Sequence, residues 1–170
     1  MKRKYWVLLI VAIWIISVDQ WTKSTVMEKL PLHQSIKVVE GFFSLTHVRN
    51  TGGAFGIFGG ARGGLGSVLF LVVSLVAIGC IFVLLVRLKD SDKHLSLSYS
   101  LILSGAIGNL IDRVRYGEVV DFLDFYISSF HWPAFNIADS AICVGIGLMA
   151  LELLLHDRKR STKSQAPNPK

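Results

Sequence analysis

Four long apolar runs, separated by polar segments, dominate the hydrophobic pattern of this 170-residue chain. A helix that crosses a bilayer needs about 17–25 apolar residues. The second and fourth runs are long enough, and the first and third reach this length when their polar ends are included. The pattern therefore predicts an all-α integral membrane protein with transmembrane helices at about residues 5–22, 65–88, 95–112 and 134–155. Pro133 suits the first turn of the fourth helix, because its missing N–H is not needed there.

The segment between the first two helices has a different pattern. Residues 35–40 (SIKVVE) and 42–48 (FFSLTHV) carry β-branched and aromatic residues on either side of Gly41, which predicts two short strands. Eight of the 15 glycines then fall between residues 52 and 66. This stretch matches neither phosphate-binding glycine motif, so we expect a flexible connection into the second helix.

Charge orients these elements. The chain is 52% hydrophobic, only 18% charged, and carries a formal net charge of +6. Basic residues gather before the first helix, between the second and third, and after the fourth. This positive-inside pattern places both termini and the 87–94 loop in the cytoplasm, with residues 24–64 and about 112–134 outside. No aromatic residues are interleaved with the basic groups, so nucleic-acid binding is not expected.

The ends of the chain and its cysteines have ordinary interpretations. MKRK before an apolar run fits a cleaved signal peptide, but no small-x-small cleavage site follows, so we expect an uncleaved helix. Residues 1–157 then form a single polytopic domain, and residues 158–170 form a polar cytoplasmic tail. Cys80 and Cys143 lie within apolar runs, where free cysteines act as small buried hydrophobes.

Polar residues interrupt the predicted helices at a single depth, near the outer membrane surface. The first apolar run ends at Asp19, and Asp121 and Asn50 lie in the two outer loops. Ionisable groups within membrane segments are costly, so they are candidates for a functional site. The set comprises Asp19, Lys23, Asn50, Asn109, Asp112, Arg113, Asp121, Asn136 and Asp139.

Each of these groups also has a structural interpretation. Asp19 and Lys23 are four residues apart, as in an ordinary helical ion pair. Asp112 and Arg113 suit structural ion pairs at a helix end, with each other or with other charges. Asn136 suits an N-cap. Glu118 and Asp124 are expected to be solvated loop acids. Asp139 is harder to explain, since it lies beyond the usual capping position.

Motifs limit the possible chemistry. The chain lacks the HExxH and GxSxG motifs, and its five histidines show no metal-ligand spacing. A Ser–Lys dyad of Lys23 with Ser104 or Ser140 is conceivable but has no motif. An aspartic dyad remains, in which two carboxyl groups share one proton and activate water. Spacing alone does not decide whether Asp139 pairs with Asp121 or with Asp112.

A small transporter or channel subunit is the alternative from another class, with Asp112, Asp121 and Asp139 as an ion path. It predicts polar residues through the full depth of the helices. The second helix and the inner part of the fourth offer little beyond Ser74 and Glu152. The polar residues gather at one end, which favours a hydrolase near the surface, and a structural adaptor would not explain the acidic cluster.

Five motifs, in order, resemble the bacterial lipoprotein signal peptidases (signal peptidase II). They are DQWTK at 19–23, NTGGAF at 50–55, SGAIGNLIDR at 104–113, GEVVDF at 117–122 and FNIADS at 135–140. The chain departs from the family pattern at Gly53, where alanine is usual, and at Ser104, where glycine is common. Both changes keep a small residue.

The resemblance implies a membrane aspartyl endopeptidase with an extracytoplasmic β-cradle and a lid-like loop or helix between the third and fourth spans. Its substrate would be a prolipoprotein carrying diacylglycerol, cut before the lipidated cysteine. The family pattern makes Asp121 and Asp139 the catalytic pair and Asp19 and Lys23 structural. It assigns supporting or substrate-binding roles to Asn50, Gly52, Asn109, Asp112, Arg113 and Asn136.

The same resemblance sets the expected surroundings of the enzyme. No metal or cofactor is expected, and the partners are the lipidated substrate and membrane lipid, with no nucleic acid. We expect a monomer in the bacterial inner membrane, with cytoplasmic termini and an active site near the outer face.

Overall fold

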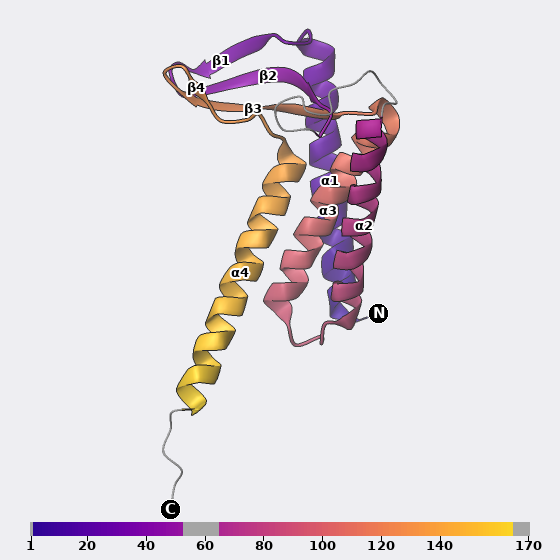
Figure 1. Ribbon diagram of the computed structural model, residues 1–170, viewed down its shortest axis with the longest axis vertical. Coiled ribbons are helices and arrows are strands. Elements are labelled where there is room, and N and C mark those ends of the chain that lie inside the picture. Colours follow the sequence, from indigo (N-terminus) through magenta and orange to yellow (C-terminus); the bar gives the residue numbers. More distant parts are fainter. Residues whose placement is uncertain (1, 53–64, 165–170) are drawn as a thin grey trace, which may run out of the picture.

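The computed structural model describes residues 2–52 and 65–164, which form four long helices beneath a four-stranded sheet (Figure 1). The start of α1 and the end of α4 lie at the end of the helices away from the sheet. The helices are α1 (Arg3–Lys29), α2 (Leu65–Arg87), α3 (Lys93–Tyr116) and α4 (Ile137–Ser164). The strands are β1 (Ser35–Val39), β2 (Phe43–Asn50), β3 (Val119–Ile127) and β4 (Phe130–His131).

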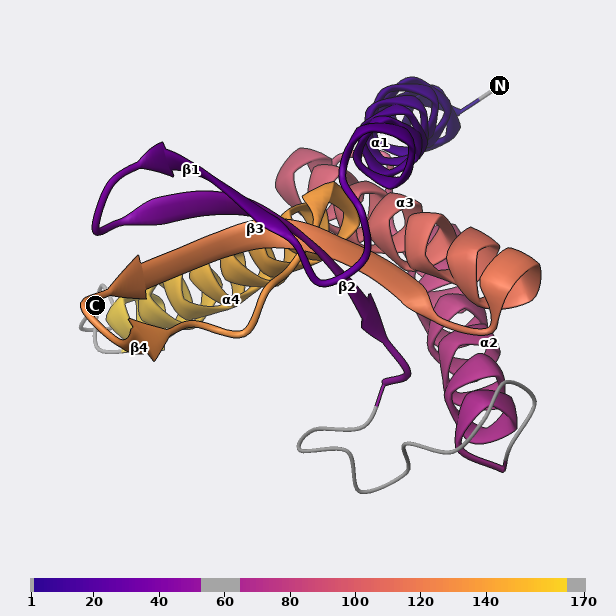
Figure 2. The same cartoon turned by 90° about the horizontal axis from the view of Figure 1, so that it is seen from above.

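The sheet is antiparallel, with strand order β1-β2-β3-β4. β1 and β2 confirm the two predicted strands. The loop or helix expected between the third and fourth spans was wrong, because that segment forms β3 and β4. Its VVDFLDFYI sequence is rich in strand-forming residues and pairs with β2 from Phe43↔Phe125 to Asn50↔Val119. Seen from above, β3 runs from the end of α3 to the region over α4 (Figure 2).

Each helix contains a segment long and apolar enough to cross a membrane. α1 is built with its polar groups inside, since its buried residues are Lys4, Asp19 and Lys23. Its tryptophans Trp6, Trp14 and Trp21 are exposed instead. Lipid is as apolar as leucine, so burying apolar groups between helices in a membrane gains little free energy. Polar contacts hold the bundle together instead.

α3 is the central helix and contacts α1, α2 and α4. Small residues cover its buried faces, so the neighbouring backbones approach closely. A Cβ at Gly105 would overlap the Ala138 carbonyl oxygen of α4, and one at Gly145 of α4 would lie 2.8 Å from the Ser98 carbonyl oxygen. The Ser100 hydroxyl donates to the Ser96 carbonyl oxygen within the same helix at 2.7 Å. The polar content of α3 therefore serves close packing.

Some helices begin or end at other residues than the predicted spans. α1 continues to Lys29, seven residues beyond the predicted end, because Asp19 and Lys23 pair inside the helix. α4 begins at Ile137, so Pro133 precedes it. The Phe135 N–H donates to the Leu123 carbonyl oxygen at 3.1 Å, which keeps this part of the chain extended beside β3. α4 then continues to Ser164, into the segment predicted as a tail.

Two other predictions concern single residues and the glycine-rich connection. Cys80 and Cys143 are free and exposed on their helices, so the buried interpretation was wrong. In a helix that faces lipid, an exposed position is still an apolar one. Most of the glycine-rich segment, including Gly53, lies outside the described residues.

Helix packing can be tested by comparing two glycines. Gly105→Ala should lower the unfolding temperature, because the added methyl group meets the α4 backbone at Ala138. Gly147→Ala in α4 is the matched control, since a Cβ there has no neighbour within 4 Å. It should be neutral or stabilising by up to about 1 kcal/mol. Thermal unfolding in detergent micelles measures both, and equal melting of the two variants would contradict this packing.

Candidate active site

Asp121 lies in β3, opposite Val48 of β2, and its side chain is buried. Its Oδ2 accepts a hydrogen bond from Asn50 Nδ2 at 2.9 Å, and its Oδ1 accepts one from Asn136 Nδ2 at 2.7 Å. Burial is the main cause that raises the pKa of Asp121 to about 7; the nearby charge of Asp139 acts in the same direction, and both hydrogen bonds oppose it. Asp121 therefore exchanges a proton near neutral pH.

Asp139 and Asn136 cap the start of α4 reciprocally. Asn136 Oδ1 accepts from the Asp139 N–H at 2.9 Å, and Asp139 Oδ2 accepts from the Asn136 N–H at 3.2 Å. This is the geometry of a capping box, in which the N-cap and the third helical residue satisfy each other's backbone donors. The N-cap prediction for Asn136 is confirmed, whereas the view that Asp139 lies beyond any capping position was wrong.

Two asparagine side chains connect the two carboxyl groups. Asn136 donates its amide to Asp121 and its backbone N–H to Asp139. Asn109 of α3 donates Nδ2 to Asp139 Oδ1 at 2.7 Å, and its own Oδ1 accepts from Asn136 Nδ2 at 3.1 Å. Strand β3, helix α3 and helix α4 thus supply one hydrogen-bonded group that contains two carboxyls.

A buried ion cluster centred on Lys23 contacts this group through Asn109. Its Nζ lies 2.9 Å from Asp19 Oδ2 and 2.9 Å from Asp112 Oδ2, and it donates to Asn109 Oδ1 at 2.9 Å. The three ionised side chains are at most 1% exposed. The Asp19–Lys23 pair is therefore confirmed. Of the two partners predicted for Asp112, Arg113 or another charged residue, the second is confirmed, because Asp112 binds Lys23.

The ion cluster also holds the backbone next to each carboxyl. Asp112 Oδ2 accepts from the Val120 N–H at 3.1 Å, and Val120 precedes Asp121. Asp19 Oδ1 accepts from the Ala138 N–H at 2.9 Å, and Ala138 precedes Asp139. One lysine therefore anchors two carboxylates, and each carboxylate fixes the residue before one member of the candidate dyad.

These contacts bear on the other pairings considered from the sequence. Both Asp112 oxygens are occupied, one by Lys23 and the Val120 N–H, the other by Gln20 Nε2 at 3.0 Å. Lys23 is bound by two carboxylates. Ser104 and Ser140 donate their hydroxyls to carbonyl oxygens of their own segments. Asp112 is thus engaged in structure, and neither serine is paired with the lysine.

Asn50, Gly52 and Arg113 border the site. The Gly52 N–H donates to Asn50 Oδ1 at 2.8 Å, and this turn aims the Asn50 amide at Asp121. Gly52 has φ +94°, and a Cβ there would lie 2.5 Å from the Phe70 ring, so only glycine fits. Arg113 Nη1 donates to the Asn109 carbonyl oxygen at 3.4 Å, within electrostatic range of Asp121 and Asp139.

The sequence interpretation missed Gln20 and misjudged Asp124. Gln20 Nε2 donates to Asp112 and, at 3.2 Å, to the Gly108 carbonyl oxygen. Its place in DQWTK was the only available signal. Asp124 is a buried residue of β3 beside His131, whose Nδ1 lies 2.9 Å from Asp124 Oδ1, so the solvated-loop prediction was wrong. Glu118 is half-buried. Among the described residues, no three His, Cys, Asp or Glu side chains are grouped to hold a metal ion.

Comparison with known proteins identifies the family. Residues 11–155 match the family model described as Signal peptidase (SPase) II. A lipoprotein signal peptidase of Geobacter metallireducens is 47% identical over 161 residues, covering 95% of this chain and 98% of that protein. One from Shewanella loihica is 46% identical over 160 residues, covering 92% of this chain and 89% of that protein. The chain belongs to the lipoprotein signal peptidase family.

Solved structures agree with this assignment of the peptidase. A structure described as a bacterial membrane enzyme, obtained by the in meso method at 1.9 Å resolution, superposes with a TM-score of 0.77 and 31% identity. The superposition covers 86% of this chain and 92% of the chain of that structure. The peptidase is a bacterial multi-pass membrane protein and an aspartic peptidase that removes signal peptides from prolipoproteins. This identity decides against the transporter and adaptor alternatives.

Lys23→Met tests the ion cluster of the peptidase. It leaves two buried carboxylates without their cation, so the free energy of unfolding should fall by about 3–5 kcal/mol. Lys37→Met is the matched control, because Lys37 lies 3.7 Å from Glu40 and both side chains are exposed. Its loss should cost at most about 1 kcal/mol. Denaturant unfolding in micelles compares the two, and equal losses would exclude a special role for the buried cluster.

Proposed function

We propose that Asp121 and Asp139 are the catalytic pair of this peptidase. The observation that carries the proposal is that Asn136 donates hydrogen bonds to both carboxyl groups, one from its side chain and one from its backbone. An aspartic dyad needs two carboxyls held close enough that they share one proton. Asn50 and Asn109 occupy the remaining oxygens, which fixes the orientation of each carboxyl.

The proposed cycle consumes one water and conserves the shared proton. The ionised carboxylate takes a proton from water, while the protonated carboxyl gives its proton to the scissile carbonyl oxygen. The hydroxide bonds to the carbonyl carbon and forms a tetrahedral diol. On collapse, the newly protonated carboxyl gives its proton to the leaving nitrogen, and the other carboxylate takes one proton back from the diol. The C–N bond breaks, and the resting state returns.

Asp121 is the member of the pair that we assign the shared proton. Burial and the charge of Asp139 raise its pKa to about 7, so it is protonated over the acidic range and up to neutrality. Asp139 lies at the N-terminus of α4, where N–H groups of Asn109 and Asn136 stabilise a carboxylate. Asp121 would therefore act first as acid and Asp139 as base.

The depth of the site supports a lipidated substrate. The two carboxyls lie where the apolar helices meet the sheet, so a substrate whose lipid remains in the bilayer would bring its scissile bond to this level (Figure 1). We propose that the substrate is a prolipoprotein with a diacylglyceryl group on the lipobox cysteine. Cleavage occurs directly before that cysteine. The exposed apolar residues Ile36, Val38 and Phe42 on the sheet give the substrate a surface to lie against.

The charge pattern supports an orientation with both chain termini in the cytoplasm. The basic residues at positions 2–4 and 87–93 occupy the end of the bundle remote from the sheet. The sheet and the dyad then lie at the outer face of the inner membrane. We propose that a single chain suffices for catalysis, because β3 and α4 of the same chain supply both carboxyls.

Removing either carboxyl tests the dyad. Asp121→Asn and Asp139→Asn should each lower kcat on a synthetic diacylglyceryl-prolipoprotein by at least about a hundredfold, since each loses a proton-transfer step. Asp124→Asn is the matched control, because Asp124 is another buried acid of β3 that pairs with His131 instead. It should stay within about threefold of wild type. A variant of Asp121 or Asp139 that keeps near-wild-type turnover while folded would remove that residue from the proposal.

The pH dependence tests the assignment of the proton. If Asp121 must be protonated, kcat/KM should fall about tenfold per pH unit above a break near pH 7. The free energy of unfolding should also fall as pH rises. The raised pKa of Asp121 adds stability that is complete below the ordinary pKa of aspartate and is lost as pH rises through about 7. Asp124→Asn should keep the same break. An activity that stays level to pH 9 would contradict this role for Asp121.

A further inference from the structure

The surface of α2 that faces away from α3 carries an apolar groove. It is lined by Val76, Gly79, Cys80, Val83 and Leu84 and has a volume of about 490 Å³. Leu85, which is fully buried, marks the opposite side of the helix. A Cβ at Gly79 would have no neighbour within 4 Å, so the missing side chain leaves the middle of the groove open.

Arg87 lies at the end of the same groove. Val76, Cys80, Val83 and Arg87 follow spacings of four, three and four residues, which places them on one helix face. Val76 and Arg87 are eleven positions apart, so the helix rises roughly 16 Å between them. This length matches roughly half the thickness of a bilayer's hydrocarbon core. The helix face from the groove to Arg87 therefore has the length of one acyl chain, with a cation where a headgroup phosphate would lie.

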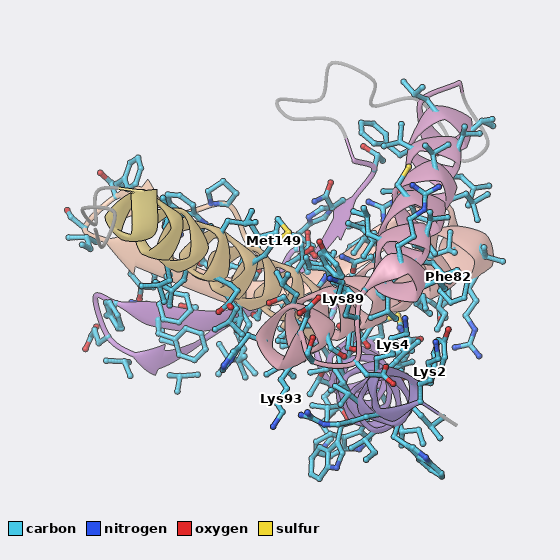
Figure 3. The ribbon with its side chains drawn as sticks, turned by 90° about the horizontal axis from the view of Figure 1, so that it is seen from below. Lys2, Lys4, Phe82, Lys89, Lys93 and Met149 are labelled. Atoms are coloured by element: carbon cyan, nitrogen blue, oxygen red, sulfur yellow. The ribbon has the colours of Figure 1, made fainter. Side chains whose placement is uncertain are left out.

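More cations surround Arg87 at this end of the bundle. Figure 3 views the molecule from this end and shows Lys2, Lys89 and Lys93 around the ends of α1, α2 and α3. All are exposed, as are Arg3 and Arg87. Within the described residues, none of these five cations lies within 4 Å of a carboxylate oxygen. Asp90 and Asp92 are in the same turn, so five cations share the region with two acids.

Lys4, a further cation at this end of the bundle, binds the C-terminus of α2. Its buried Nζ donates to the carbonyl oxygens of Val86 at 2.5 Å and Leu88 at 2.7 Å, which caps the C-terminus of α2. A helix C-terminus carries partial negative charge that would repel an anion. The Lys4 ammonium offsets that charge and also holds the start of α1, with Lys2 and Arg3, beside the end of α2.

We propose that this surface binds an anionic phospholipid. One acyl chain lies along the α2 groove from Val76 to Leu84, and the phosphate is bound by Arg87 and Lys89, with Lys2 and Lys93 around it. The positive charge selects an anionic headgroup over a zwitterionic one. The site lies at the opposite end of the helices from Asp121 and Asp139, so its occupancy is separate from the chemistry of peptide cleavage.

Native mass spectrometry of the full chain, released from micelles doped with phosphatidylglycerol or phosphatidylcholine, tests the proposal. Wild type should retain phosphatidylglycerol at least about tenfold more strongly than phosphatidylcholine. The double variant R87Q/K89Q should lose most of this preference. Lys37→Gln should keep it, because Lys37 lies in β1, at the end of the molecule opposite the α2–α3 connection (Figure 1).

A second pair of variants tests the acyl groove apart from the charge. Gly79→Leu fills the groove and should lower retention of phosphatidylglycerol about tenfold, whereas Gly147→Leu, at an equally open glycine of α4, should not. Equal retention of both lipids by wild type, or wild-type retention by R87Q/K89Q and Gly79→Leu, would overturn the proposal. Because the readout is lipid retention, either result leaves the test of the catalytic pair unaffected.

Discussion

The rest of this structure depends on one buried cation. Lys23 is 1% exposed and binds Asp19 and Asp112, each at 2.9 Å. Burying these charges costs several kcal/mol per ion, and only close pairing with additional hydrogen bonds offsets the cost. Here the additional bonds go to the backbone N–H groups of Val120 and Ala138, the residues directly before the two carboxyls of the proposed dyad. The buried ion cluster thus fixes the backbone one residue before each carboxyl of the proposed dyad, and so positions both side chains.

The membrane explains why the interior is arranged in this way. In lipid, apolar side chains gain no free energy from being buried between helices. α1 accordingly exposes its tryptophans and buries charges, and α3 buries serines and glycines. Gly108 shows how packing and charge depend on each other. A Cβ at Gly108 would lie 2.8 Å from Asp19 Oδ2, so the glycine lets the Asp19 carboxylate reach the start of α4. The small residues of SGAIGNLIDR are therefore part of the support of the site.

The sequence predicted the four helices, two of the strands and the common depth of the polar residues, because these follow from hydropathy and periodicity. It missed β3, since burial at four successive positions above the helix ends removes the alternation that marks a half-buried strand. It could not distinguish Asp112 from Asp121 as partner of Asp139. That choice depends on Lys23 of α1, which binds Asp112 of α3. A contact between two helices cannot be predicted from the spacing of residues along the chain. The role of Gln20 was hidden for the same reason.

The central claim is that Asp121 and Asp139 hold one proton between them near neutral pH. Infrared spectra of the resting enzyme in lipid test it most directly, because a protonated carboxyl has a C=O stretch separate from that of a carboxylate. The account predicts a protonated carboxyl signal that disappears with a midpoint near pH 7, is absent in Asp121→Asn and persists in Asp124→Asn. A wild-type enzyme whose buried carboxyls are all ionised at pH 5 would contradict it.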